Sequence, residues 1–434
     1  MSHDSYGEPP HASRAANGTV AAGDLLEDTD EPAFTGHPRR RRRPLRQNIL
    51  IPIIVMALAV AGVVIAERDI KPLQELLGVC SVTNAAAVIP RDGVLFGVNL
   101  DWKSETLAQH RANLGHSPAV AVQFSDIPYD RATWDHTKSA VRQVRENGGV
   151  LLLTLEPHAG LDAMSPEVVN QLAYDLLDLN NHGVPVIVRF AHEMNGSWYA
   201  WGQQPAHYVA VFRRVADAVH RIAPGSSMMW APNYGGGYPF AGGQFAAKPG
   251  TDNFRALDTD GDGVLTMHDD SYAPYYPGDQ YVDWVGVSLY HWGNHHPWGN
   301  NDITEPNKFE QMLTGTYDGT AGNDTGVPNF YQVYGVEHRH PVAIVETAAI
   351  FTPSRIGQSE LAVKQAWWKQ IFSDETHRRF PQLKMINWFE WKKYEIEIND
   401  YVDWRAAGSP AIRNAFVADL PQWLNYAGSV HACS

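Results

Sequence analysis

The chain has 434 residues, of which 44% are hydrophobic, which is enough for a sizeable core in one large domain with additional segments. The formal net charge of −14 at pH 7 argues against a nucleic-acid partner, because nucleic-acid binding requires a basic face. We expect a monomer.

The N-terminal part differs in composition from the remainder. Residues 1–48 are rich in Pro, Gly, Ala and charged residues, which predicts a disordered tail on the cytoplasmic side of a membrane. Residues 49–66 form an uncharged apolar run that, at about 1.5 Å per residue, nearly spans a hydrocarbon core of roughly 30 Å. Arginines precede this run and Glu67 follows it, which predicts a cytoplasmic N-terminus. We therefore expect a single-pass transmembrane signal-anchor over 49–67 in the cell membrane, with the following domain outside the cell.

Two other interpretations of the apolar run stay open. It could be a cleaved signal peptide with Val64-Ile65-Ala66 as the processing site, or a buried core helix. A 48-residue segment before the apolar run is longer than signal peptides carry, which favours the retained anchor. Residues 68–89 are expected to be a linker to the domain over 90–434.

The chain has two cysteines, Cys80 and Cys433, near the two ends of the expected external domain. Outside the membrane, an even number of cysteines favours a disulfide. A bond between these two would close a very long loop, which in the chain-entropy model gives the larger stabilisation. Two free thiols are the alternative.

From residue 94 onward, short β-rich apolar runs alternate with longer amphipathic segments. The eight runs are Val94–Val98, Ala119–Phe124, Val150–Leu155, Pro185–Phe190, Ser227–Ala231, Trp284–Leu289, Val342–Val345 and Lys384–Trp388. The helix-like segments include Asp135–Asn147, Pro166–Asn180, Pro205–Ile222 and Glu360–Phe372. This alternation predicts an α/β fold of the closed (β/α)₈ TIM-barrel type. A doubly wound open sheet is the competitor, but no Gly-rich phosphate loop follows the first run.

Four glutamates lie at the expected carboxyl ends of strands, where the active site of such a barrel is found. They are Glu156, Glu193, Glu346 and Glu390. Glu193 and Glu346 follow the fourth and seventh runs, which face each other across an eight-stranded barrel. Cleavage of a glycosidic bond needs two carboxyl groups on opposite sides of the sugar. This pair therefore predicts work on a carbohydrate.

A structural role is the alternative for His192-Glu193, which could form a buried ion pair that supports the barrel. A metalloprotease motif is excluded, because H-E-x-x-H requires a second histidine where this chain has Gly196.

The run from Arg189 to Gly202, R-F-A-H-E-M-N-G-S-W-Y-A-W-G, resembles the acid/base signature of glycoside hydrolase family 26, whose best-known members are β-mannanases. Similar strand ends occur at 155–158, 230–233, 283–290 and 344–346, so that the resemblance covers roughly residues 90–400. It implies a retaining glycosidase with Glu193 as acid/base and Glu346 as nucleophile, whose carboxyl groups are about 5–5.5 Å apart.

The resemblance also implies a set of substrate-binding residues. Tyr290 is expected to hydrogen-bond Glu346, and His192 to contact the sugar hydroxyl beside the reacting carbon. The remaining members are His158 and Trp198 at the cleavage subsite, Trp201 and Trp388 as stacking platforms, and Arg189, Asn195 and Trp230. No cofactor is expected for catalysis, and the expected partners are a polysaccharide substrate and the membrane.

The substrate that this resemblance favours is β-1,4-mannan, which the enzyme would cleave at internal bonds of the polysaccharide. The Gly-rich stretch 233–243 and the His/Trp/Asn-rich stretch 290–301 depart from the mannanase pattern. Mixed-linkage β-1,3/1,4-glucan and β-1,3-xylan therefore stay open as substrates. A catalytically silent glycan-binding domain at the cell surface is a third hypothesis.

Residues 258–269 match an EF-hand calcium loop, with glycine at position 6 for the sharp turn and hard carboxylate oxygens. The expected ligands are Asp258, Asp260, Asp262, Val264 through its carbonyl, and Asp269. Because position 12 holds Asp instead of Glu, a solvated turn is the alternative. A structural calcium ion would brace this insertion between the fifth and sixth strands.

Overall fold

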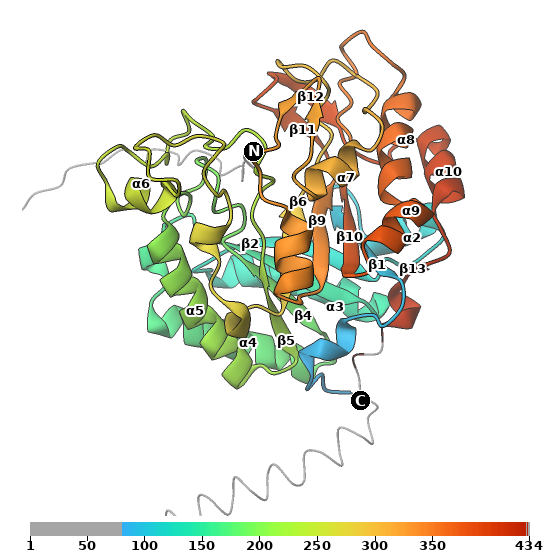
Figure 1. The fold of residues 1–434 in the computed structure, drawn as a ribbon. Coiled ribbons are helices and arrows are strands. Elements are labelled where there is room, and N and C mark those ends of the chain that lie inside the picture. The colour runs from blue at the N-terminus through green and yellow to red at the C-terminus, as the bar shows by residue number, and fades with distance from the viewer. Residues whose placement is uncertain (1–79, 431, 433–434) are drawn as a thin grey trace, which may run out of the picture. The chain divides into compact units, whose positions relative to one another are not determined.

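The computed structural model describes residues 80–430 and 432 (Figure 1). The expected tail (1–48), membrane anchor (49–67) and first part of the linker lie outside these residues, as does Cys433. Within the described range, none of the helices combines the length and the apolar character needed to cross a membrane.

Eight parallel strands form a closed barrel, as the sequence predicts. The strands are β1 (Val94–Leu100), β2 (Val120–Asp126), β3 (Val150–Glu156), β4 (Val186–Phe190), β5 (Ser226–Trp230), β6 (Trp284–Ser288), β9 (Val342–Thr347) and β10 (Leu383–Glu390). Each strand pairs with the next in this order, and β10 pairs with β1 to close the barrel. The short strand β13 (Leu424–Asn425) pairs in parallel with the first two residues of β1.

Two layers of apolar side chains hold the barrel together. The smaller cluster takes side chains from all eight strands, such as Leu152 of β3 and Met229 of β5, and therefore fills the barrel interior. The larger cluster includes Val188 and Phe190 of β4 together with Val211 and Phe212 of the helix packed behind it, and so lies between strands and helices. Strands buried on both faces read as continuous apolar runs, which explains why the runs were visible in the sequence.

Helices surround the barrel. They are α2 (Leu107–Leu114), α3 (Arg131–Asn147), α4 (Pro166–Asn181), α5 (Pro205–Ile222), α8 (Glu360–Ile371), α9 (Asp374–Arg379) and α10 (Pro410–Asp419). All of these except α5 begin at a residue whose side chain caps the first turn. The Ser165 side chain caps α4 by accepting from the Val168 amide, and Pro166 occupies the first turn. Gly148 ends α3 in the left-handed conformation, with φ of 80°.

Long excursions follow the carboxyl ends of β5, β6 and β10. They contain α6 (Asp252–Leu257), α7 (Lys308–Leu313) and two small hairpins, β7–β8 (Asp318–Gly319 and Gly322–Asn323) and β11–β12 (Lys392–Glu395 and Asp400–Asp403). In Figure 1, α6 and the β11–β12 hairpin lie at the upper end of the barrel. A π-helix, Tyr331–Glu337, precedes β9.

The described part of the expected linker is packed, so the linker prediction is wrong for these residues. The amide of Val82 donates to the carbonyl of Asn180 at 2.9 Å, and Val82 and Val88 are buried against the barrel. A 3₁₀ helix spans Ala85–Val88. Cys80 is disulfide-bonded; because Cys433 is not described, the bond between the two stays a prediction.

Candidate active site

The carboxylate of Glu346 is held by two groups inside the barrel. The guanidinium of Arg189 donates to Oε1 of Glu346, and the hydroxyl of Tyr290 donates to Oε2 at 2.7 Å. Ser288 fixes the other end of the guanidinium by accepting from Arg189 at 3.0 Å. Arg189 and Glu346 are both buried, with exposed fractions of 0% and 1%. A buried carboxylate with a cation and a phenol as donors is stabilised in its ionised form.

A slip in strand register explains why Glu346 faces inward. Ala343 and Val345 belong to the interior cluster and Ile344 to the outer one, so strict alternation would turn Glu346 towards the helices. However, β6 pairs Val287 with Ile344 and Ser288 with Glu346, so that β9 carries one extra residue between the two pairs. Such a bulge redirects a side chain, and it brings Glu346 onto Arg189.

Burial keeps Tyr290 in its protonated form. Burial raises the pKa of the Tyr290 hydroxyl well above its ordinary value, and the charges of Glu346 and Glu193 add to this shift. The phenol therefore stays a hydrogen-bond donor to Glu346. Glu193 follows β4 and Glu346 lies at the carboxyl end of β9, so both predicted catalytic residues lie at the same mouth of the barrel.

Glu193 follows β4 in a backbone conformation that non-glycine residues rarely adopt. Its φ is 53°, and Ala191, two residues earlier, has φ of 47°. Each such residue costs on the order of 1–3 kcal/mol, and such strain clusters at functional sites. The Glu193 side chain is 2% exposed, and its Oε2 has no hydrogen-bond partner among the described residues.

The backbone around Glu193 is fixed by hydrogen bonds from three directions. The Glu193 amide donates to the carbonyl of Ala231 beyond β5 at 2.9 Å. The indole of Trp201 donates to the carbonyl of His192 at 2.7 Å. Asn195 exchanges two hydrogen bonds of 2.8 Å with the backbone of Asn233. Both polar groups of the Asn195 side chain are thus used inside the protein, so its predicted substrate contact is wrong and it positions the loop.

Trp198 lies at the border of a cavity beside this loop. The cavity has a volume of about 410 Å³ and is lined by Trp198, Tyr290, Asn233, Phe240, Trp292 and Lys308, among others. Trp198 is half-buried and packs edge-on against Phe240, and its indole N–H has no partner among the described residues. An aromatic wall with free polar groups suits a sugar ring, which has apolar faces and hydroxyl edges.

Three of the predicted sugar-stacking or substrate-binding tryptophans are buried, and these predictions are wrong. Trp230 packs against Phe330 and Tyr334, and Trp388 against Phe416, in the layer between barrel and helices. Trp201 is 0% exposed and stacks on Tyr199 with 4.3 Å between ring centroids. Trp201 therefore supports His192 from within the protein.

Two other residues predicted to contact the substrate, Arg189 and His192, are buried beside the two glutamates. Arg189 is fully buried and is occupied by Glu346 and Ser288, so it orients the carboxylate and does not bind substrate. His192 is also fully buried, among the rings of Phe124, Tyr199 and Trp201. A contact between His192 and a sugar hydroxyl stays a prediction.

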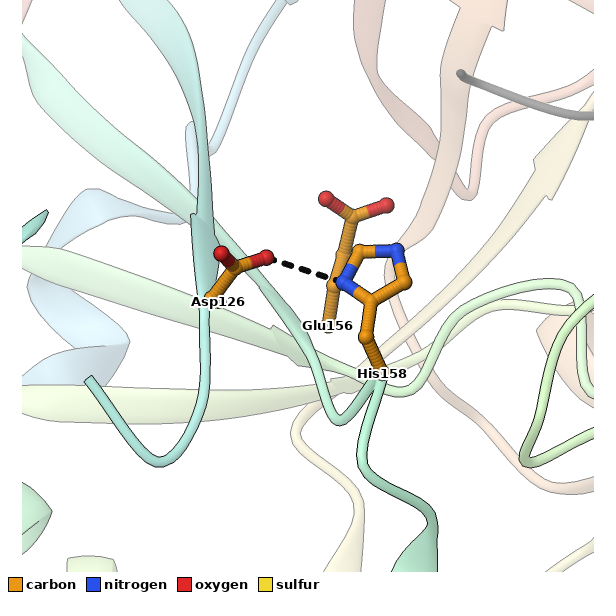
Figure 2. Close-up of side chains that lie close together, drawn as sticks. All are labelled: Asp126, Glu156 and His158. Carbon is orange, nitrogen blue, oxygen red and sulfur yellow. Dashed lines mark hydrogen bonds and ion pairs between the residues drawn. The ribbon is translucent and has the colours of Figure 1, made fainter. Parts of the chain in front are cut away.

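His158 lies beyond the end of β3 in a cluster with two carboxyl groups, Asp126 and Glu156 (Figure 2). Its Nδ1 is 2.8 Å from Oδ1 of Asp126, and this hydrogen bond raises the pKa of the imidazole. Burial raises the pKa of the Glu156 carboxyl to about 8, with the charges of Asp126 and Glu346 adding to the shift and His158 opposing it. The cluster borders the Glu346 site.

Sequence reasoning missed Asp126 and Ser288. Asp126 is the last residue of β2, beyond the apolar run, and Ser288 ends β6 as a small polar residue within an apolar run. Their positions at strand ends were the available signal. Glu390, by contrast, is structural: its carboxylate accepts from the amides of Ala406 and Ala407 at 2.9 and 3.2 Å.

The predicted calcium loop brings three of its carboxylates together. Asp258, Asp260 and Asp262 each place one oxygen within 4.8 Å of the others, and Oδ1 of Asp258 is buried with no partner among the described residues. Asp269 does not join them: its oxygens accept from the amides of Thr259 and Thr266 at 2.6 and 2.8 Å. Three hard oxygen donors fit Ca²⁺, whereas Asp269 closes the loop.

Fold and site together define a class: a (β/α)₈ barrel with two buried glutamates at the carboxyl ends of the fourth and seventh strands beside an aromatic cavity, as in glycoside hydrolases. Comparisons with known proteins agree. Residues 154–241 match Glycosyl hydrolase family 26. Endoglucanase H of Acetivibrio thermocellus is 23% identical over 304 residues, or 67% of this chain and 27% of that protein. The mannan endo-1,4-beta-mannosidase of Bacillus subtilis is 24% identical over 32% of this chain and 33% of its own length.

Solved structures show the same fold. The catalytic domain of the family 26 endo-beta-1,4-mannanase of Bacillus sp. JAMB-750 has a TM-score of 0.52 at 16% identity, over 81% of this chain and 94% of that chain. A modular endo-beta-1,4-mannanase of Cellulomonas fimi has a TM-score of 0.51 at 14% identity, over 82% and 78%. The predicted resemblance to glycoside hydrolase family 26 is confirmed: residues 154–241 match that family, and the solved structures share the barrel fold. The chain spans about a quarter of the length of endoglucanase H and about a third of the length of the Bacillus subtilis mannosidase.

Proposed function

We propose that this protein is a retaining endo-β-glycanase that cleaves β-1,4-mannan-type polysaccharides. The observation that carries this proposal is the different environment of the two glutamates. Glu346 accepts hydrogen bonds from Arg189 and Tyr290, which suits an ionised nucleophile. Glu193 is buried with an unpartnered oxygen, which suits a group that carries and transfers a proton.

The proposed reaction has two steps. Glu346 attacks the anomeric carbon while Glu193 protonates the leaving oxygen, so that a covalent glycosyl-enzyme forms and the glycosidic bond breaks. Glu193 then removes a proton from water, which displaces Glu346 and restores the original anomeric configuration. The residues around Glu193 and Glu346 supply position and charge, and the chemistry requires no metal or cofactor.

The proposed substrate rests on the relatives and on the cavity. Three of the relatives described here bear names of β-1,4-mannan-cleaving enzymes, and one is named an endoglucanase. The cavity beside Trp198 and Tyr290 offers aromatic surface for a sugar ring on one side of the catalytic pair. The relative named an endoglucanase favours a β-glucan as the second candidate substrate, ahead of β-1,3-xylan.

Hydrolysis of a glycan panel tests the proposal. β-Mannan is expected to be cleaved in mid-chain, and NMR of the first product is expected to show the same anomeric configuration as the substrate. Glu193→Ala and Glu346→Ala are each expected to abolish cleavage of the polysaccharide. With an activated aryl glycoside, azide is expected to give a retained glycosyl azide with Glu193→Ala and an inverted one with Glu346→Ala.

The outcomes separate the hypotheses. Cleavage of mixed-linkage glucan with no action on mannan would show that the substrate is the glucan and that the mannan hypothesis is wrong. Binding of a glycan without hydrolysis by the wild type would support a silent binding domain. Wild-type activity in both glutamate variants would overturn the site. We further propose that residues 49–67 anchor the enzyme in the membrane. Recovery of the full-length enzyme in the soluble fraction of cells would contradict the membrane anchor.

A further inference from the structure

Asp126 and Glu156 end neighbouring strands side by side. They are the last residues of β2 and β3, and the two are register partners across the parallel pair. His158 follows two residues later and turns back over the strand ends, with its amide donating to the carbonyl of Glu156 at 2.9 Å. Figure 2 shows the Asp126 carboxylate bonded to the imidazole and the Glu156 carboxylate beside both.

The three side chains form one compact donor set. One ligand atom from each, two carboxylate oxygens and a ring nitrogen, lie within 4.8 Å of one another. An ion with bonds of about 2.0–2.2 Å to carboxylate oxygen and imidazole nitrogen separates its tetrahedral ligands by about 3.4 Å. The 2.8 Å contact between Asp126 and His158 would need to open by only a fraction of an ångström.

Glu156 supplies an independent observation that points to a bound cation. The residue is 5% exposed, and its Oε1 has no hydrogen-bond partner among the described residues. A buried polar atom without a partner costs about 1–3 kcal/mol and is rare in native structures. No interaction described for the mechanism uses this oxygen. It borders the cluster, where a cation would satisfy it.

We propose that Asp126, Glu156 and His158 bind one divalent transition-metal ion, with Zn²⁺ as the best match. Binding would release the protons of Glu156 and His158, and the resulting two carboxylates and neutral imidazole carry a charge of −2, which a divalent ion neutralises. Zn²⁺ accepts this mixture of nitrogen and oxygen ligands, whereas Ca²⁺ and Mg²⁺ prefer oxygen alone. Bound there, the ion would join the ends of β2 and β3 beside the Glu346 site.

The site is open on one side and closed on the other. The side chains of Asp126 and His158 are 56% and 35% exposed, so that an ion can enter from solvent. Glu156 closes the inner side. With three protein ligands, a tetrahedral ion keeps one position for water.

Titration of the metal-free full-length chain with ZnCl₂ tests this proposal by calorimetry, with calcium present to fill the loop over 258–269. We expect one Zn²⁺ site in the wild type. Glu156→Gln and His158→Ala are each expected to lower the Zn²⁺ affinity of this site by at least about ten-fold. Zn²⁺ is also expected to raise the melting temperature of wild type and of neither variant.

A matched control is His182→Ala. His182 forms a similar but exposed pair with Asp178, at 3.4 Å from Nδ1 to Oδ1. This variant is expected to bind Zn²⁺ as wild type does. Circular dichroism checks that Glu156→Gln, which keeps the shape of the side chain, is folded.

Equal Zn²⁺ affinity in wild type, Glu156→Gln and His158→Ala would overturn the proposal, as would the absence of binding in wild type. These readouts need no glycan. If the protein binds Zn²⁺ but hydrolyses no glycan, the proposed glycanase function is wrong and the metal site stands. If it hydrolyses a glycan but does not bind Zn²⁺, the metal site is wrong and the glycanase function stands.

Discussion

The hydroxyl of Tyr290 donates to Oε2 of Glu346 at 2.7 Å, while Arg189 holds the other carboxylate oxygen. The two donors come from strands on either side of β5, since Arg189 lies in β4 and Tyr290 follows β6. Together they fix the direction of the carboxylate and favour its charge. The proposed nucleophile is therefore oriented before any substrate binds.

Tyr290→Phe removes one of these two donors. A hydrogen bond to a charged group contributes about 1.5–3 kcal/mol, so we expect kcat/KM for mannan to fall roughly 10–100-fold with the fold intact. Steady-state kinetics of the two proteins measure this. Tyr129→Phe removes a similar bond to a carboxylate, Asp175, outside the site and is expected to leave kcat/KM unchanged. An equal loss in both variants would contradict the role of Tyr290.

Arg189→Met leaves the buried Glu346 carboxylate without its cation. Removing one partner of a buried ion pair costs about 3–5 kcal/mol, and we expect the free energy of unfolding to fall by that amount. Urea denaturation measures the change. In Arg189→Met/Glu346→Gln the uncompensated charge is gone, so the double variant is expected to recover part of the loss. A double variant no more stable than Arg189→Met would show that the ion pair is not the cause.

Gly196→Ala tests the position of Trp198. A Cβ at residue 196 would lie 2.3 Å from Cζ2 of Trp198, which is closer than such atoms approach, so the indole must move. We expect a several-fold rise in KM for mannan with a small change in stability. Gly428→Ala adds a methyl group in open space and is the control. If the KM of Gly196→Ala matches that of Gly428→Ala, Trp198 does not contact the substrate.

We propose that Asp258, Asp260 and Asp262 hold a structural Ca²⁺. Because the ion binds the folded state, its removal by EGTA is expected to lower the melting temperature. Asp260→Ala is expected to have the lower melting temperature already and to show no further change with EGTA. Asp318→Ala, an exposed residue outside the loop, serves as the control and should respond as wild type does. A wild-type melting temperature insensitive to EGTA would remove the proposed ion.

The pair of His220 and Asp283 gives a pH dependence of stability. Nε2 of His220 is 2.8 Å from Oδ2 of Asp283, and this hydrogen bond raises the pKa of the imidazole. The folded state therefore binds the proton more tightly than the unfolded chain. Its stabilisation is complete below the ordinary histidine pKa and is lost as pH rises through the folded pKa.

Replacement of this histidine by Gln is expected to destabilise the protein more at pH 5.5 than at pH 9. Urea unfolding of wild type and His220→Gln at the two pH values measures the difference. Because both side chains are about one-third exposed, at 32% and 36%, solvent screening reduces the effect. Equal destabilisation at both pH values would mean that the proton on His220 is not stabilised by Asp283.

Much of the fold was determined by local sequence. Each strand of the barrel is a short apolar run, because a strand covered on both faces must be apolar along its length. The helices between them carry their own boundaries, such as Ser165 before Pro166 and Gly148 after α3. The polar residues that end these runs marked Glu193 and Glu346, since the active site of such a barrel lies at the carboxyl ends of its strands.

Tertiary structure alone decided which side chains face the substrate. A run that is apolar throughout shows no alternation, so the sequence does not tell whether Trp230 and Trp388 point to the barrel mouth or to the helices, and both point to the helices. The extra residue in β9 turns Glu346 inward, and no local pattern reveals it. Closure of the barrel brings Arg189 to Glu346 across 157 residues and sets Asp126 beside His158. These contacts depend on strand register, which pairing with neighbours decides.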